Sequence, residues 1–192
     1  MKENVLAMLL GGAFGDCAGS KYERLDQTGD TAPLQHVDFH NPTFSDDTQL
    51  TFATCEALIA NEGRVEPEQI AKQFVVWFRE RRLTGLGAST LKALRDLDAG
   101  SHWALSGTKG ERAAGNGAAM RIAPLALVVE PDEPSSRRVI RDTCRITHHN
   151  EEAYVGALTV VLAISAGQSG SDSLLSDVAL RLPDSVTRDR LT

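Results

Sequence analysis

Apolar side chains recur along this chain at intervals of three and four residues, the spacing that gathers them on one face of an α-helix. The pattern predicts a first helix from about residue 3 to about residue 19. Further helices are expected to begin at Ser45, at Pro67 and at residues 147–150, with others through residues 91–97 and 139–144. Sustained strand alternation and hairpin signals are lacking in the sequence. We therefore predict an all-α domain.

Two glycine-rich segments interrupt this regular pattern. Glycines 11, 12, 15 and 19 fall inside the first predicted helix, where each costs about 1 kcal/mol relative to alanine, so we expect a backbone or a ligand to approach closely there. A predicted loop of some twenty residues ends at Gly117. Loops of that length in compact domains are usually functional or mobile, and we favour a functional one.

Composition narrows the class of protein. The 192 residues carry a net charge of -6, with 42% hydrophobic and 24% charged residues, as expected of a globular domain. The only basic run is residues 79–82, which argues against a nucleic-acid surface. No apolar run could span a bilayer, no signal peptide is recognised, and Cys17, Cys55 and Cys144 suit buried thiols. We expect a cytoplasmic protein without a nucleic-acid or membrane partner.

The adjacent carboxylates Asp46 and Asp47 are the first candidate for chemistry. They follow Ser45 at a predicted helix start, and two like charges so close favour a divalent cation that compensates them. The alternative is purely structural, because Ser45 is a good N-cap and acidic residues in a first turn suit the helix dipole. The sequence pattern alone leaves both interpretations open.

Two further segments could bind a substrate. Gly115, Asn116 and Gly117 could form a backbone concavity for phosphate oxygens ahead of a helix, or a plain turn. Arg121 could pair with a phosphate or with a neighbouring carboxylate. His148 could offer its imidazole to a substrate or make a structural hydrogen bond, and Asp16 is expected to make a structural hydrogen bond within its own helix.

Taken together, four segments resemble the ADP-ribosylglycohydrolase family, typified by the dinitrogenase reductase-activating glycohydrolase. They are residues 11–23, 44–48, 115–121 and 147–153, and the resemblance covers roughly residues 4–168. Each segment is weakly specific by itself, except Gly-Asn-Gly-Ala-Ala-Met-Arg-Ile-Ala-Pro, which is nearly diagnostic.

The resemblance implies an orthogonal multi-helix bundle that binds two divalent cations, usually Mg²⁺ with Mn²⁺ as the alternative, and cleaves ADP-ribose from an acceptor at the ribose anomeric carbon. It implies Ser45, Asp46 and Asp47 as metal ligands, with Glu23 and Asp47 in catalysis. The implied substrate-binding residues are Gly115, Asn116, Gly117, Met120, Arg121 and His148. The implied partner is an ADP-ribosylated protein or small molecule.

One element of the family pattern is missing. Family members carry an Asp-x-Asp-Thr motif near the C-terminus, and the nearest counterpart here, residues 96–99, lacks the hydroxyl and lies elsewhere. Asp46, Asp47 and Glu23 supply too few oxygens for two octahedral ions, so we expect an incomplete site with one ion or loose binding. We interpret residues 1–192 as a single domain without the C-terminal part of the family domain, with residues 169–192 as a weakly ordered tail. Two explanations for the missing motif stay open, a truncated fragment and a shortened homologue, and the abrupt tail favours a fragment.

Three hypotheses about function follow from the sequence. The leading one is a metal-dependent ADP-ribosylglycohydrolase. The alternative is a catalytically inactive module that binds ADP-ribose or a nucleotide, and a third is a helical protein whose glycines serve packing alone. The acceptor, whether arginine, serine, a base or a small molecule, is not encoded in any motif we recognise.

Overall fold

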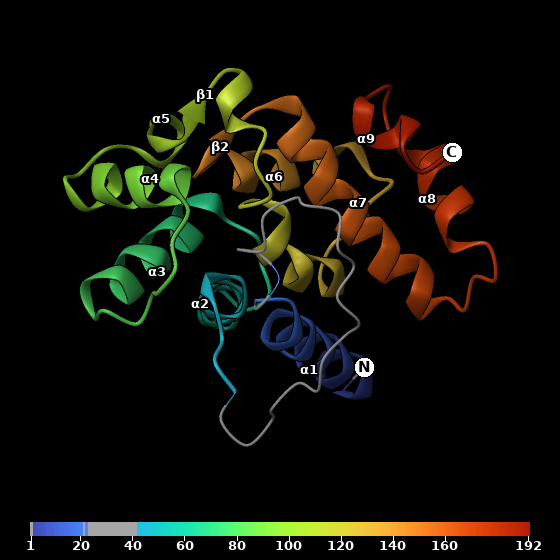
Figure 1. Ribbon diagram of the computed structural model, residues 1–192, viewed down its shortest axis with the longest axis horizontal. Coiled ribbons are helices and arrows are strands. Elements are labelled where there is room, and N and C mark those ends of the chain that lie inside the picture. The colour runs from blue at the N-terminus through green and yellow to red at the C-terminus, as the bar shows by residue number, and fades with distance from the viewer. Residues whose placement is uncertain (1, 21, 23–41) are drawn as a thin grey trace.

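The computed structural model describes residues 2–20, 22 and 42–192, and nearly all of its secondary structure is helical, which confirms the all-α prediction. Short 3-10 helices and a pair of two-residue strands connect the α-helices in this part of the chain (Figure 1). The α-helices are α1 (Lys2–Gly19), α2 (Asp46–Ala60), α3 (Pro67–Arg79), α4 (Ala88–Asp98), α5 (Trp103–Ser106), α6 (Pro134–Arg145), α7 (Glu151–Gln168), α8 (Leu174–Arg181) and α9 (Val186–Asp189). The other elements are η1 (Glu111–Ala113), η2 (Ala119–Arg121), η3 (Ala123–Leu127), β1 (Thr108–Lys109) and β2 (His148–His149).

Helices α2 and α7 form the centre of the core. The 3-10 helices η2 and η3 contact both of them and so join them through one set of apolar side chains. Leucine burial of this kind stabilises a fold by about 1.5–3 kcal/mol for each side chain. The fully buried side chains at this junction are Leu50, Ala53, Ile122, Leu125, Leu158 and Leu162.

The two central helices begin at well-formed caps. The Ser45 side chain accepts a hydrogen bond from the backbone N–H of Asp47 at the start of α2, as predicted for an N-cap. Asn150 does the same for α7, accepting from the N–H groups of Glu152 and Ala153. At its other end α2 stops at Asn61, and Gly63 follows with a φ of 81°.

Helix α3 packs one face against this core. Pro67 occupies the first turn, where its missing N–H is not needed, as the sequence predicts. Ile70, Phe74 and Trp77 are buried at the expected helical spacing, and α4 and α6 pack alongside.

The predicted loop of some twenty residues contains more structure than the sequence indicated. It forms α5, β1 and η1, and β1 pairs in parallel with β2, with Thr108 opposite His148. Gly107 permits this approach, because a Cβ there would lie 2.3 Å from the carbonyl oxygen of Arg145. The expectation that residues 147–150 open a helix is therefore wrong in part: His148 and His149 are extended, and α7 begins only after Asn150.

Helix α1 lies beside α2 at one edge of the fold (Figure 1). Leu10 and Phe14 of α1 are 60% and 58% exposed. A Cβ at any of the four glycines of α1 would meet no described atom within 4 Å, so the predicted close backbone approach is absent from the part of the chain that the structure describes. Gly11, Gly12 and Gly15 instead line a cavity of about 200 Å³ between α1 and α2.

Residues 169–192, for which the sequence predicted a weakly ordered tail, form α8 and α9 against α7. Val178 and Leu182 are buried in this contact. The Glu152 carboxylate accepts hydrogen bonds from the backbone N–H groups of Val186 and Thr187 at the start of α9. Among residues 2–20, 22 and 42–192, no helix is long and apolar enough to cross a membrane.

Candidate active site

The start of α2 places Asp46 and Asp47 beside a cavity of about 450 Å³, which we call the Asp46 cavity. Asp46 is only 7% exposed, and its Oδ1 lies 3.7 Å from the Cβ position that a side chain at Gly85 would occupy. Gly85 has a φ of 77°, a conformation that favours glycine. The remaining walls come from the first turn of α4, residues 115–117, Met120 and His148.

The Asp16 side chain of α1 is hydrogen-bonded to the first turn of α2. Its Oδ2 accepts hydrogen bonds from the backbone N–H of Ser45 at 2.9 Å, from that of Thr48 at 3.3 Å and from the Thr48 hydroxyl at 2.6 Å. Asp16 therefore makes structural hydrogen bonds, as expected, but to the next helix and not within its own. This contact orients the turn that carries the two carboxylates.

Residues 115–117 pack directly against the imidazole of His148. A Cβ at Gly117 would lie 2.6 Å from His148 Cε1 and 3.0 Å from the Thr90 hydroxyl, and a Cβ at Gly115 would lie 3.5 Å from His148 Nε2. Glycine at 117 is therefore required by the close approach of a side chain. The sequence suggested a backbone concavity there, but it did not indicate this steric reason.

The same loop presents unpaired donors. Within the described residues, the backbone N–H groups of residues 115–118 donate no hydrogen bond, while the carbonyl of Asn116 accepts from Met120. Unpaired N–H groups at the wall of a cavity attract an anion. This arrangement is compatible with the predicted phosphate contact.

His148 is 4% exposed and lines the cavity through one side of its ring. Its Nδ1 lies 2.8 Å from the Thr147 hydroxyl. Burial, and after it the positive charge of Arg121, lowers the pKa of His148 from 6.5 to about 4. The imidazole is therefore neutral at pH 7 and can both donate and accept a hydrogen bond.

Arg121 lies in the interior behind this wall and does not line the cavity. Its side chain is fully buried, with hydrogen bonds to the carbonyls of Gly117 and Thr143 and to the Thr147 hydroxyl. The guanidinium carbon lies 4.8 Å from the centroid of the Phe74 ring, a favourable cation–π contact. Burial lowers the pKa of Arg121 to about 10, so it stays charged at neutral pH. The sequence placed this residue at a phosphate or a carboxylate, whereas its hydrogen bonds to described residues go to two carbonyls and a hydroxyl behind the cavity wall.

The structure thus gathers most of the expected site residues around one cavity. Asp46, Asp47, Gly115, Asn116, Gly117, Met120 and His148 line it. Ser45 caps α2 and lies outside the lining, Arg121 lies behind it, and Glu23 falls outside the described residues. In the described part of the chain, no three His, Cys, Asp or Glu side chains cluster as metal ligands.

Sequence reasoning missed Thr90. Thr90 is 2% exposed, lines the cavity and faces Gly117, while Thr147 is fully buried between Arg121 and His148. Thr147 directly precedes His148 and so belongs to a segment that the sequence singled out. Thr90 carries no such signal, because it lies in an ordinary amphipathic helix.

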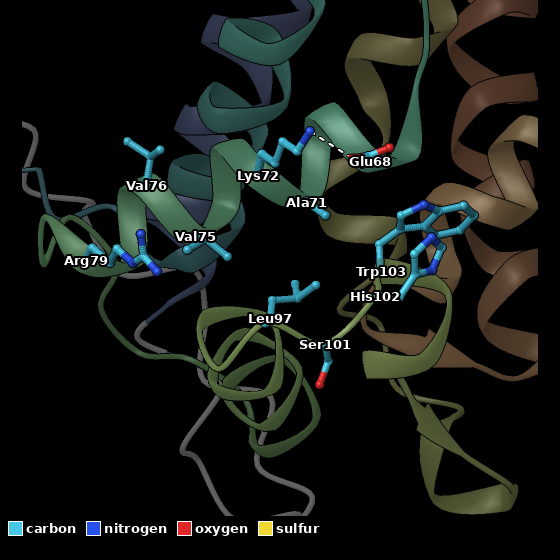
Figure 2. A pocket seen from close by; sticks show the side chains of 11 residues that line it. Glu68, Ala71, Lys72, Val75, Val76, Arg79, Leu97, Ser101, His102 and Trp103 are labelled. Carbon is cyan, nitrogen blue, oxygen red and sulfur yellow. Dashed lines mark ion pairs between the residues drawn. The ribbon is translucent and has the colours of Figure 1, made fainter.

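Another cavity, about 530 Å³ in volume, lies between α3 and the α4–α5 segment. We call it the Trp103 groove. Figure 2 shows Ala71, Val75 and Leu97 facing one another across it, with His102 and Trp103 at one end. None of the segments expected to carry chemistry contributes to it.

Comparison with known proteins gives a consistent result. The model of the ADP-ribosylglycohydrolase family matches residues 1–191. An uncharacterized protein of Archaeoglobus fulgidus is 28% identical over 193 residues, which cover 95% of this chain and 62% of that protein. The human ADP-ribosylhydrolase ARH3 is 27% identical over 198 residues, which cover 92% of this chain and 54% of that enzyme.

A solved structure described as an ADP-ribosylglycohydrolase-related protein complex superposes with a TM-score of 0.67 at 27% identity. The match covers 91% of this chain and 60% of that one. The chain therefore spans between 54% and 62% of the length of these relatives.

Proposed function

Because the chain belongs to the ADP-ribosylglycohydrolase family, we propose that it is a metal-dependent hydrolase that cleaves ADP-ribose from a modified acceptor at the ribose anomeric carbon. The observation that supports this proposal is the convergence of Asp46, Asp47, residues 115–117 and His148 on one cavity. Its volume of about 450 Å³ lies within the range of sites that hold small ligands. We also propose that the chain is of the dinitrogenase reductase-activating type within this family.

The cation in this proposal is Mg²⁺, with Mn²⁺ as the alternative, held by Asp46 and Asp47. Carboxylate oxygens are the ligands that Mg²⁺ prefers, and the ion retains water where the protein supplies few donors. The fit is partial, because the described residues offer no third acidic ligand beside this pair. When bound, the cation would supply positive charge that orients the ribose hydroxyls.

The chain's own carboxylates account for the proton transfer. In the proposed reaction a water oxygen bonds to the anomeric carbon as the bond from that carbon to the acceptor breaks. Asp47 accepts the proton from the water, and the electron pair of the broken bond leaves with the acceptor. The acceptor then takes up the proton that Asp47 releases. A carboxylate near this carbon also stabilises the positive charge that develops on the sugar. Glu23 is the other base expected from the sequence, and it lies outside the described residues.

The pyrophosphate would lie against residues 115–118. Their unpaired N–H groups supply donors, and the neutral imidazole of His148 adds another without placing a second positive charge beside Arg121. The proposed partners are ADP-ribosylated proteins or small molecules. The free thiols of Cys17, Cys55 and Cys144 support a cytoplasmic location.

The test is release of ADP-ribose by the full chain. Peptides ADP-ribosylated on arginine and on serine would be incubated with the protein in Mg²⁺, in Mn²⁺ and in EDTA, and free ADP-ribose measured by chromatography. We expect release with a divalent cation and none with EDTA. No release from either peptide at stoichiometric protein concentration would contradict the catalytic proposal.

A second candidate function is a binding module without turnover, and the lack of a third acidic ligand among the described residues favours it. Calorimetric titration with ADP-ribose separates the two. Tight binding that EDTA leaves unchanged, together with zero turnover, would support the module. Binding that needs Mg²⁺ supports the hydrolase.

A further inference from the structure

The side chains of Arg121, Thr147 and His148 form a buried chain of hydrogen bonds that leads to the wall of the Asp46 cavity. Arg121 Nη2 donates to the Thr147 hydroxyl at 2.8 Å, and the same hydroxyl lies 2.8 Å from His148 Nδ1. We propose that Arg121 is a positioning residue that acts through Thr147 to hold His148 in the tautomer protonated at Nε2. His148 then presents a fixed, neutral N–H donor to a ligand in the cavity.

The direction of the hydrogen bonds follows from counting protons. A guanidinium only donates, so the Thr147 oxygen must accept from Arg121. The hydroxyl has one hydrogen of its own, and among the described residues His148 Nδ1 is the only acceptor within hydrogen-bonding distance of it. If Nδ1 carried a proton instead, the buried hydroxyl hydrogen would be left without an acceptor, which is unfavourable in a dry interior.

The ring cannot turn away from this arrangement. Residues 115–117 pack against the Cε1 and Nε2 atoms of the His148 ring, and the Cβ position of Gly117 lies 2.6 Å from Cε1. Nε2 faces this loop at the cavity wall, 3.5 Å from the Cβ position of Gly115. The nitrogen that carries the proton is therefore the one on the cavity side.

A neutral N–H donor suits an oxygen acceptor beside a carboxylate pair. An imidazolium there would be opposed by the charge of Arg121 behind it, whereas the neutral ring donates one hydrogen bond at a fixed angle. That this donor meets the pyrophosphate or the ribose of ADP-ribose rests on the proposed function. The tautomer itself does not.

Nitrogen-15 NMR of the full chain without ligand tests the tautomer directly. Long-range spectra distinguish a protonated from an unprotonated ring nitrogen, and His148→Gln assigns the signals. We expect protonated Nε2 and unprotonated Nδ1 in the wild type. Protonation at Nδ1, or a mixture of both tautomers, would overturn the proposal whether or not the protein hydrolyses ADP-ribose.

Matched variants test the roles of Thr147 and Arg121. Thr147→Val removes the hydroxyl at nearly constant shape, and we expect a mixture of tautomers, while Thr147→Ser keeps the hydroxyl and should restore the single tautomer. Arg121→Met should also give a mixture, because the guanidinium then no longer fixes the direction in which the Thr147 hydroxyl points its hydrogen. Circular dichroism checks folding, and if Arg121→Met fails to fold, Arg121→Lys, which retains a donor, is expected to keep the wild-type tautomer. Wild-type tautomers in Thr147→Val would overturn the relay.

Calorimetry with ADP-ribose separates the two proposals. Loss of one donor should weaken binding about tenfold in Thr147→Val and leave it unchanged in Thr147→Ser. A correct tautomer without any ADP-ribose binding would reject the proposed function and leave the relay intact. A wrong tautomer with full ADP-ribose binding would reject the relay and leave the proposed function intact.

Discussion

The Asp46 cavity and the Trp103 groove differ in what their polar groups contact, although their volumes are similar, about 450 and 530 Å³. In the groove, Lys72 pairs with Glu68 at 2.8 Å and Arg79 with Asp98 at 2.5 Å, so both basic side chains of the lining already have a carboxylate partner. In the cavity, the buried Asp46 and the partly exposed Asp47 share the lining with a neutral histidine and with residues 115–117, whose backbone N–H groups donate no hydrogen bond among the described residues. By volume alone the groove would be chosen as the candidate active site, whereas the polar groups favour the Asp46 cavity.

The largest contrast is expected in catalysis. Asp47→Asn keeps the shape of the side chain but removes its charge, so we expect release of ADP-ribose to fall by about a hundredfold or more. Asp172→Asn, at an exposed position far along the chain, is the matched control and should keep the wild-type rate. The double variant Lys72→Ala, Arg79→Ala tests the groove. If the groove variant loses activity and Asp47→Asn does not, our choice of cavity is wrong.

A methyl group added to the cavity wall should destabilise the fold. Gly117→Ala would place its Cβ against His148 and Thr90, and overpacking of this kind costs about 1–3 kcal/mol. Gly11→Ala is the matched control, since its Cβ would meet open space and alanine favours a helix by up to about 1 kcal/mol. Urea unfolding measures both. Equal stability of the two variants would contradict the close contact at Gly117.

The buried imidazole should make stability depend on pH. His148 has a pKa of about 4 in the folded chain and near 6.5 when unfolded, so the unfolded chain binds more protons between these values. Its contribution is fully present above the unfolded pKa and is lost as the pH falls toward 4, a change on the order of 2 kcal/mol. Urea unfolding from pH 7 to pH 4 should show a shallower decline in His148→Gln than in the wild type.

The smallest effect is expected from the groove's ion pair. Lys72 and Glu68 are exposed neighbours one turn apart on α3, and water screens the attraction between such a pair. Lys72→Ala should therefore change the free energy of unfolding less than Gly117→Ala does, and added salt should reduce the difference further. A larger loss would indicate that the groove charges are coupled to the core.

The local sequence pattern was sufficient to predict many of the helices and the segments that line the cavity. Apolar spacing predicted the helices that begin after Ser45 and at Pro67, because both depend on caps and faces within a few residues. It also singled out the segments that line the cavity, since carboxylates at a helix start and a Gly-Asn-Gly loop are unusual in sequence. The resemblance to a family supplied their proposed roles.

Only the tertiary structure placed Arg121 in the interior, set His148 against Gly117 and brought Asp16 to the next helix. It also paired β1 with β2 and folded residues 169–192 onto α7. Each of these features joins positions that are distant along the chain or decides whether a polar side chain faces solvent or the core. Periodicity and propensity describe a residue's near neighbours, so they cannot determine which remote group will satisfy it.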